Sequence, residues 1–169
     1  LTTWYASQFP YIRFTGLDRS LKSIQMASKY AQLLNLHNVT FHRCAIPEDA
    51  ISSKFDAIIA THALFQSETH PGLPSWSWKT FERKYDIDLQ VCAEQQTGIG
   101  PRLDWLLKKL KPNGKLLLFE KASHLGRRVL FQRALKNRSL QAFQEAVFLT
   151  YSLVDEFVGD GPLYVLMQE

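Results

Sequence analysis

The order of hydrophobic and polar positions near the start of the chain predicts a strand followed by a helix. An apolar stretch over residues 12–17 stops at Asp18 and then at Ser20, and both residue types favour helix starts. From Leu21 to Leu34 apolar residues recur every three or four positions, which predicts a helix with one apolar face that ends near Asn35. The strand therefore delivers Asp18 to a sheet edge.

Two further strands are predicted after this helix. Residues 39–44 alternate between apolar and polar side chains, and residues 55–62 form an almost wholly apolar run, typical of a strand that is covered on both faces. Strands that alternate with helices and loops in this order predict a parallel sheet with right-handed crossovers. The predicted fold class is therefore α/β.

Regular patterns return in the second half of the chain. Leucines over residues 103–110 have the spacing of an amphipathic helix, a Lys-Pro-Asn-Gly turn follows at residues 111–114, and residues 115–120 predict a buried strand. Two short helices are expected next, one over residues 129–134 and one that starts near Ser139.

The C-terminal tail predicts two strands, residues 151–157 and 163–167, joined by the Gly- and Pro-containing residues 158–162. A connection this short makes the two strands antiparallel.

Residues 66–100 interrupt these patterns. Strong turn formers surround Trp76 and Trp78, so the segment is predicted to be an irregular insertion. A long aromatic loop at the carboxyl edge of a sheet can form a lid over a site, or its rings can simply anchor it to the body. Both interpretations stay open.

Composition restricts the class of protein. The chain has 169 residues, of which 46% are hydrophobic and 21% charged, which suits one domain with its own core. No apolar run approaches the ~20 residues that cross a bilayer, so no membrane partner is expected. Two dispersed cysteines, Cys44 and Cys92, predict reduced thiols in a cytoplasmic protein, and no residues have metal-ligand spacing. The net charge of +4 allows an acidic ligand and does not exclude nucleic acid.

Four segments together resemble the class I S-adenosylmethionine-dependent methyltransferases. They are the Gly-Leu-Asp-Arg-Ser stretch at residues 16–20, the strand starts at 38–41 and 55–59, and the helix, turn and strand over 106–118. The resemblance, which covers residues 12–169, implies a Rossmann-like, mostly parallel sheet flanked by helices, with a C-terminal antiparallel strand pair. It also implies S-adenosylmethionine as the cofactor and methyl transfer to an unidentified acceptor, a small molecule or of another kind.

The resemblance assigns cofactor contacts to two strand ends. Asp18 corresponds to the residue that holds the ribose hydroxyls, and Leu17 and Arg19 flank the adenosine. A carboxylate at such a strand end can accept both hydroxyls of a ribose, although the same residue could merely cap the next helix. Ala45 and Ile46 fall where the family surrounds adenine.

The turn after the second strand departs from the family pattern. The family places an acidic residue there for the adenine amino group, whereas this chain has Cys44, Ala45 and Ile46. That contact is therefore lost, or it passes to Glu48 or Asp49.

Thr61 and His62 lie at the end of the apolar strand, where in the family the acceptor meets the methionine portion of the cofactor. Because histidine titrates near neutral pH, His62 is the candidate general base. The alternative is a histidine that only hydrogen-bonds the neighbouring backbone.

Five basic residues follow the last parallel strand in a stretch without acidic residues. They could hold an anionic acceptor, or they could form a solvated helix face. They are Arg127, Arg128, Arg133, Lys136 and Arg138.

The largest departure is the absence of the family's first strand with its glycine-rich motif. Residues 98–100 do not replace it, because no buried strand precedes them and Pro101 follows directly. Residues 1–10 look like the tail of a helix, so we expect a single methyltransferase-like domain over residues 1–169 that lacks its N-terminal part.

This departure has consequences for binding and for function. The isolated chain is expected to bind S-adenosylmethionine weakly or not at all, and a homo-oligomer is one way in which the sheet could be completed. Two alternatives to the enzyme stay open: a non-catalytic methyltransferase-like interaction module, and a fragment of an NAD-binding oxidoreductase. The oxidoreductase fits less well because its fingerprint is also missing.

Overall fold

The computed structural model describes residues 1–65, 85–120, 122, 125–154 and 156–168. The chain divides into two compact units, residues 1–52 and 53–169. None of the helices in the described part of the chain combines the length and apolarity that a bilayer crossing requires.

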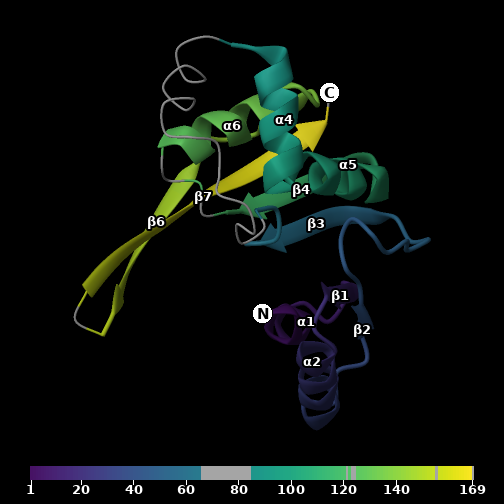
Figure 1. Ribbon diagram of the computed structural model, residues 1–169. Coiled ribbons are helices and arrows are strands. Elements are labelled where there is room, and N and C mark those ends of the chain that lie inside the picture. The colour runs from purple at the N-terminus through teal and green to yellow at the C-terminus, as the bar shows by residue number, and fades with distance from the viewer. Residues whose placement is uncertain (66–84, 121, 123–124, 155, 169) are drawn as a thin grey trace. The chain divides into compact units, whose positions relative to one another are not determined.

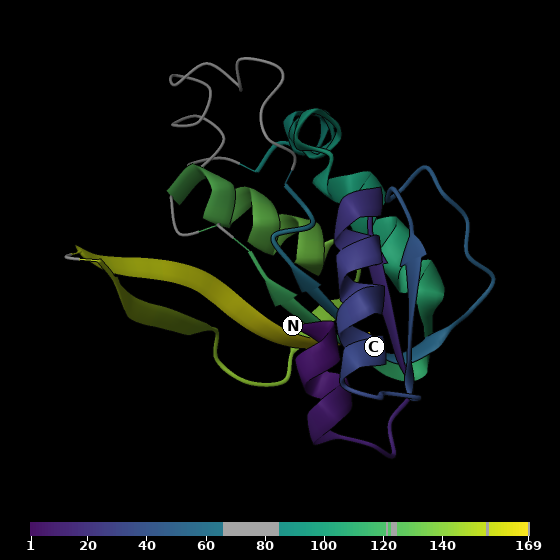
Figure 2. The ribbon, with the colours of Figure 1, turned by 90° about the horizontal axis from the view of Figure 1, so that it is seen from below.

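The N-terminal unit contains two helices and a pair of parallel strands. Strands β1 and β2 pair with Asp18 opposite Arg43, and α1 and α2 contact each other and the strands (Figure 2). The Oγ of Ser20 accepts the backbone N–H of Ser23 at 3.2 Å and so caps α2, as predicted. The elements are α1 Thr2–Gln8, β1 Phe14–Asp18, α2 Leu21–Leu33 and β2 Val39–Arg43.

The side chain of Asn38 links residues 6–12 to the start of β2. Its side-chain amide donates to the carbonyl oxygens of Ala6, Phe9 and Ile12 at 2.9–3.1 Å. The backbone N–H of Phe14 donates in turn to the carbonyl of Asn38 at 2.8 Å. One side chain therefore fixes the end of α1 against the start of β2, which sets the register of the strand pair that carries Asp18.

The C-terminal unit is a five-stranded sheet with three described helices. Its strand order is β3-β4-β7-β5, with β6 pairing with β7. Strands β3 and β4 are parallel, and all pairs that involve β7 are antiparallel. The elements are β3 Phe55–Thr61, α4 Ile87–Thr97, α5 Ile99–Lys109, β4 Leu110–Phe119, α6 Leu125–Lys136, β5 Leu140–Ala142, β6 Val147–Leu153 and β7 Glu156–Gln168.

The core of this unit lies between the sheet and its helices. Leu103 of α5, Leu116 and Leu118 of β4, and Phe131 of α6 are fully buried. The ring of Phe131 meets the ring of Tyr164 on β7 edge to face, with centroids 5.5 Å apart. Figure 1 shows α4, α5 and α6 together on one side of the strands, while the β6–β7 hairpin extends away from the rest of the sheet.

Most of the predicted elements are confirmed. The helix over residues 21–34, the strands at 39–44 and 55–62, and the helix over 103–110 are all present within a few residues. The Lys-Pro-Asn-Gly turn forms a bulge inside β4, because Phe55 pairs with Leu110 and Ala57 already pairs with Lys115.

The predicted irregularity of residues 66–100 is wrong for its last part. Residues 87–97 form α4, which Asp86 caps by accepting the backbone N–H groups of Asp88 and Leu89, and which Gly98 ends with a φ of 71°. Trp76 and Trp78, for which a lid and an anchoring role stayed open, lie outside the described residues.

Two predictions about the C-terminal region are also wrong in detail. The helix expected from Ser139 is instead the short strand β5 and the start of β6. The final strands are antiparallel as predicted, but β6 ends at Leu153 and β7 already begins at Glu156, so residues 158–162 are not the connection between them. Residues 158–162 belong to β7, where the pairing shifts because Leu149 faces Asp160 while Val147 faces Leu163.

Candidate functional site

Asp18 ends β1 and is exposed. Its Oδ1 accepts the backbone N–H of Ser20 at 2.7 Å, and its carbonyl oxygen accepts the backbone N–H of Cys44 at 2.9 Å. The capping role that the sequence left open is therefore present. Oδ2 accepts no hydrogen bond from the described residues, so one carboxylate oxygen stays available to a ligand at the carboxyl end of the parallel pair.

The neighbours of Asp18 are held by the second strand. The side chain of Leu17 is half-buried, and Arg19 is exposed. The Nε of Arg43 donates to the carbonyl oxygen of Arg19 at 3.2 Å. The backbone beside Asp18 is thus fixed without using the Arg19 side chain.

Ala45 and Ile46 directly follow the buried Cys44 after β2, and both are half-buried. Oδ2 of Asp49 accepts the backbone N–H of Ala45 at 2.7 Å, and the N–H of Asp49 donates to the carbonyl of Ala45 at 2.8 Å. Asp49 therefore closes this turn, whereas Glu48 is exposed. Leu17, Asp18, Arg19, Ala45 and Ile46 come together at one edge of the β1–β2 pair.

Thr61 and His62 occupy the carboxyl end of β3 in the second unit. Thr61 pairs with Phe119, and the backbone N–H of His62 donates to the carbonyl oxygen of Phe119 at 2.8 Å. His62 has a φ of 49°, in the left-handed region that few non-glycine residues adopt. Its imidazole lies beside the ring of Phe119, with centroids 5.1 Å apart.

A buried carboxylate faces the imidazole. Nε2 of His62 lies 3.6 Å from Oδ2 of Asp160, whose side chain is only 8% exposed against 37% for His62. Oδ1 of Asp160 accepts the backbone N–H of Gly161 at 2.8 Å, and the hydroxyl of Tyr151 donates to Oδ2 at 3.4 Å. The sequence did not single out Asp160, because the predicted turn at residues 158–162 made it look like an ordinary turn residue.

Glu120 supports the segment that follows His62. Its Oε1 accepts the backbone N–H groups of Ala63 and Leu64 at 2.7 and 2.8 Å, and Nη1 of Arg102 donates to the carbonyl of Leu64 at 3.1 Å. Burial raises the pKa of Glu120 to about 7, against the opposing effects of these backbone hydrogen bonds and of the Arg102 charge. The turn after β3 is therefore held by buried polar groups of β4 and α5.

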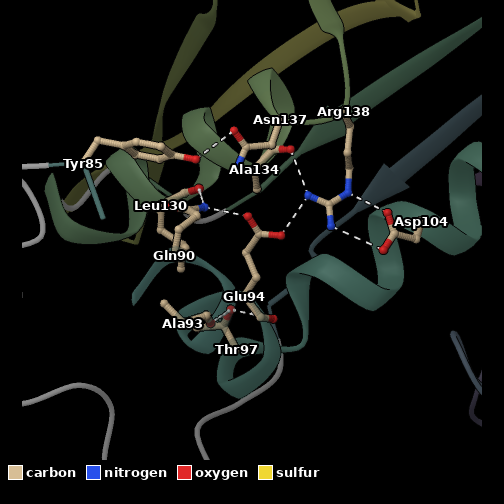
Figure 3. Close-up of polar contacts among 10 residues, drawn as sticks. All are labelled: Tyr85, Gln90, Ala93, Glu94, Thr97, Asp104, Leu130, Ala134, Asn137 and Arg138. Atoms are coloured by element: carbon tan, nitrogen blue, oxygen red, sulfur yellow. Dashed lines mark hydrogen bonds and ion pairs between the residues drawn. The ribbon is translucent and has the colours of Figure 1, made fainter. Parts of the chain in front are cut away.

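A second polar cluster connects the three helices of the C-terminal unit. Figure 3 shows the guanidinium of Arg138 between two carboxylates: it donates to Glu94 at 2.8 Å and to Asp104 at 2.7 Å. Gln90, which is fully buried, donates to Glu94 at 2.6 Å and to the carbonyl of Leu130 at 3.2 Å. Burial acts to lower the pKa of Arg138, but the hydrogen bonds to Asp104 and Glu94 outweigh it and raise that pKa.

Three of the five basic residues after β4 contact other residues of the same unit. Arg127 lies over the ring of Phe65 at 5.6 Å and Arg133 lies over the ring of Tyr85 at 5.4 Å, while Arg138 belongs to the cluster of Figure 3. These contacts favour a structural role for this face of α6. Within the described ranges, no three His, Cys, Asp or Glu side chains are grouped to hold a metal ion.

The sequence of most of the chain matches a known family. A methyltransferase domain family model matches residues 3–146. The chain belongs to this family. The predicted methyltransferase resemblance is therefore confirmed, and methyl transfer is the reaction of the family. Among curated proteins, none matches this methyltransferase domain.

Solved structures with the same fold are methyltransferases of low sequence identity. The N-methyltransferase NodS from Bradyrhizobium japonicum WM9, in complex with S-adenosyl-L-homocysteine, is 16% identical with a TM-score of 0.62, and the match covers 99% of this chain and 72% of NodS. A methyltransferase from Pyrococcus furiosus is 14% identical, with a TM-score of 0.55 and coverage of 98% and 67%. TrmN from Thermus thermophilus is 18% identical, with a TM-score of 0.57 and coverage of 99% and 40%. The α/β fold class with C-terminal antiparallel strands is confirmed.

Proposed function

We propose that this methyltransferase domain transfers a methyl group from S-adenosylmethionine to an acceptor that carries a removable proton. The observation that carries the proposal is the family match over residues 3–146. The donor is supported by the NodS structure, which holds S-adenosyl-L-homocysteine, the molecule that remains when S-adenosylmethionine has given up its methyl group.

Asp18 is the residue that we assign to the ribose hydroxyls. A carboxylate oxygen that accepts no hydrogen bond from the described residues, at the carboxyl end of a parallel strand and at the start of a helix, is suited to accept hydroxyl groups. Leu17 and Arg19 flank it on the chain, and Ala45 and Ile46 supply a half-buried apolar surface at the neighbouring strand end, which suits adenine. The residues present fit an adenosine group.

His62 is the residue that we assign to the acceptor. Its imidazole is partly exposed and ends a parallel strand, and its backbone is fixed on both sides by Phe119 and Glu120. Positioning of the reactants accounts for most of the catalysis in such a transfer, and a base is needed only when the acceptor must lose a proton. His62 would take up that proton, and Thr61 would lie beside the acceptor.

The experiment is a calorimetric titration of the protein with S-adenosylmethionine and, separately, with NAD. Binding of the first and not of the second supports the proposal, and binding of NAD alone would show an oxidoreductase. A folded protein that binds neither, at ligand concentrations that detect the weak binding expected of this chain, would favour an interaction module. Transfer of labelled methyl groups to a panel of amines, phenols, lipids and RNA then identifies the acceptor, and His62→Gln should reduce that transfer about tenfold or more without changing cofactor affinity.

A cytoplasmic location also belongs to this proposal. Neither Cys44 nor Cys92 forms a disulfide within the described part of the chain. Cysteines that stay reduced are the rule in a reducing compartment. Alkylation of both cysteines in freshly prepared cell extract, without added reductant, would support this location.

A further inference from the structure

The conformation of His62 directs its side chain out of the ordinary path of strand β3. A residue that continued the strand would have a negative φ, whereas His62 has a φ of 49°. The hydrogen bond from its N–H to Phe119 and the anchoring of Ala63 by Glu120 hold the backbone on either side of this conformation. Strained backbone of this kind persists when the surrounding structure over-determines it, and it concentrates at functional sites.

The conformation of His62 brings its imidazole close to the buried carboxylate of Asp160. Asp160 lies inside β7, and its side chain is 8% exposed. An ionised carboxylate is costly to bury unless charges or hydrogen-bond donors compensate it. The compensating groups are the N–H of Gly161, the hydroxyl of Tyr151 and the imidazole of His62. Of these three groups, only the imidazole can acquire a charge opposite to that of Asp160.

We propose that Asp160 is a positioning residue for His62: it holds the Nε2–H of the imidazole and leaves Nδ1 as the atom that accepts the acceptor's proton. The inference rests on the proposed function, in which His62 is the base. The nitrogen nearest to the carboxylate is Nε2, at 3.6 Å from Oδ2. This distance exceeds a formed hydrogen bond, and contacts of this kind are often long before the ligands bind.

The transfer is balanced in atoms and charge. The acceptor's heteroatom forms a bond to the methyl carbon, and the bond between that carbon and the sulfonium sulfur breaks with its electron pair left on sulfur. The proton of the acceptor passes to Nδ1 of His62. The imidazolium that results carries its other proton toward Asp160, whose negative charge stabilises it.

With Asp160 as the positioning residue, the β6–β7 hairpin contributes residues to the site. Tyr151 and Asp160 come from its two strands, and Leu149 faces Asp160 directly across the pair. Residues that face each other in an antiparallel pair place their side chains on the same face. The hairpin thus presents the carboxylate to His62, and the hydroxyl of Tyr151 donates to the same oxygen, Oδ2, that lies nearest to the imidazole.

Other charged or titratable groups besides Asp160 also lie around this turn. Tyr151 contacts Asp160 from β6, Glu120, directly after β4, binds the two residues that follow His62, and Arg102 of α5 donates to the carbonyl oxygen of Leu64. None of these three side chains forms a hydrogen bond or ion pair with the imidazole itself, so a change in the protonation pattern of the imidazole after substitution of Asp160 reports the contact with Asp160.

The first test uses nitrogen-15 NMR on the full chain with labelled histidine, without any ligand. In the wild-type protein the neutral His62 should be protonated at Nε2 alone. In Asp160→Ala the ring should become a mixture of the two neutral tautomers. Protonation at Nδ1 in the wild type, or the same tautomer population in Asp160→Ala, would overturn the inference.

Asp56→Asn is the matched control for this measurement. It removes a carboxylate from the same unit, near the opposite end of β3, where Asp56 forms an exposed ion pair with Lys111 at 2.9 Å. The His62 spectrum should not change. If Asp160→Ala does not fold, Asp160→Asn keeps the size of the side chain and an oxygen for the Gly161 N–H, and it is judged by the same criterion.

The second test uses the acceptor that shows turnover in the methyl-transfer panel. Asp160→Asn should lower kcat about tenfold or more and leave the KM for S-adenosylmethionine unchanged, because the cofactor residues are untouched. If His62→Gln is impaired but Asp160→Asn is fully active, the positioning role is wrong and the base remains. If His62→Gln itself is fully active, the assignment of the base is wrong.

Discussion

The carboxylate of Glu120 accepts a 2.8 Å hydrogen bond from the backbone N–H of Leu64, 56 positions earlier in the chain. The same oxygen accepts the N–H of Ala63, so one buried side chain fixes the turn that follows His62. Glu120 is 1% exposed, and burial raises its pKa to about 7. The turn beside the candidate base is therefore held by a group whose charge changes near neutral pH.

The first prediction concerns the pH dependence of stability. Glu120 has a pKa of about 7 in the folded protein and an ordinary pKa of 4.5 in the unfolded chain, so between these values the folded state binds a proton that the unfolded state has released. The stabilisation that results is complete below pH 4.5 and is lost as the pH rises to 7. Relative to Glu120→Gln, the wild-type free energy of unfolding should fall by up to about 3 kcal/mol across this window.

Urea unfolding of both proteins at several pH values between 4 and 8 measures this difference. Asp56→Asn serves as the control, because the hydrogen bond to Lys111 lowers the pKa of Asp56 from 3.8 and its titration lies below the window. Parallel stability curves for the wild type and Glu120→Gln would show that Glu120 keeps an ordinary pKa.

The second prediction separates the two carboxylates that Arg138 binds. Arg138→Met leaves Glu94, whose side chain is 9% exposed, without its ion-pair partner, so the free energy of unfolding should fall by about 3–5 kcal/mol. Asp104→Asn removes a carboxylate that is 52% exposed and should cost about 1 kcal/mol or less. Chemical denaturation of both variants measures the two values. Equal losses would contradict the assignment of the buried pair to Glu94.

The third prediction concerns Gly16 in the middle of β1. A Cβ at this position would lie 2.5 Å from Cδ1 of Phe41 on the paired strand, too close for any real contact. Gly16→Ala should therefore destabilise the protein by about 1–3 kcal/mol, because the ring must move. In the background Phe41→Leu, which removes part of the ring, the same substitution should cost less. A double-mutant cycle measures this coupling, and additive losses would place the strain elsewhere.

The elements that the sequence predicted well are those with a clear local pattern, even where burial is incomplete. Helix α2 has a serine cap and regularly spaced apolar residues, and β3 is apolar except for Asp56 and Thr61, although Ile59 in β3 is 45% exposed. The end of β1 was located by the abrupt change from an apolar stretch to Asp18. The positions of Asp18 and His62 at strand ends followed from these elements alone.

Helix α4 escaped prediction because two of its three buried residues, Gln90 and Glu94, are polar. Gln90 and Glu94 lie inside, where they bond to each other and Glu94 bonds to Arg138, whereas Val91 is 54% exposed. An apolar stripe at helical spacing is therefore missing from the sequence. Only the partner residues, which are distant in the chain, make this burial favourable.

Asp160 escaped prediction for a different reason. Asp160 is surrounded by three turn formers, Gly159, Gly161 and Pro162. In the structure these residues lie inside β7, at the place where its pairing with β6 shifts. The C-terminal tail contains two segments at which the chain could form a hairpin turn, and the sequence alone does not show which of them is used. Because β7 already begins at Glu156, Asp160 lies in a strand that passes His62 and not in a loop.

The last prediction separates the two roles of Asp18. Oδ1 accepts the N–H of Ser20 beside the start of α2, and Oδ2 is the oxygen that we assign to the ribose. Asp18→Asn keeps an oxygen for Ser20 but loses the charge and one acceptor, so the free energy of unfolding should change little. The affinity for S-adenosylmethionine should fall by about 1.5–3 kcal/mol, the contribution of a charge-assisted hydrogen bond.

Asp18→Ala removes both oxygens and completes the comparison. It should lose the same affinity and, in addition, about 1 kcal/mol of stability, because the Ser20 N–H loses its acceptor. Calorimetry gives the affinities, and urea unfolding gives the stabilities of the two variants. If both variants lose stability but bind S-adenosylmethionine as the wild type does, Asp18 is a helix-start residue only, and the ribose contact must be sought among the other residues of this strand end.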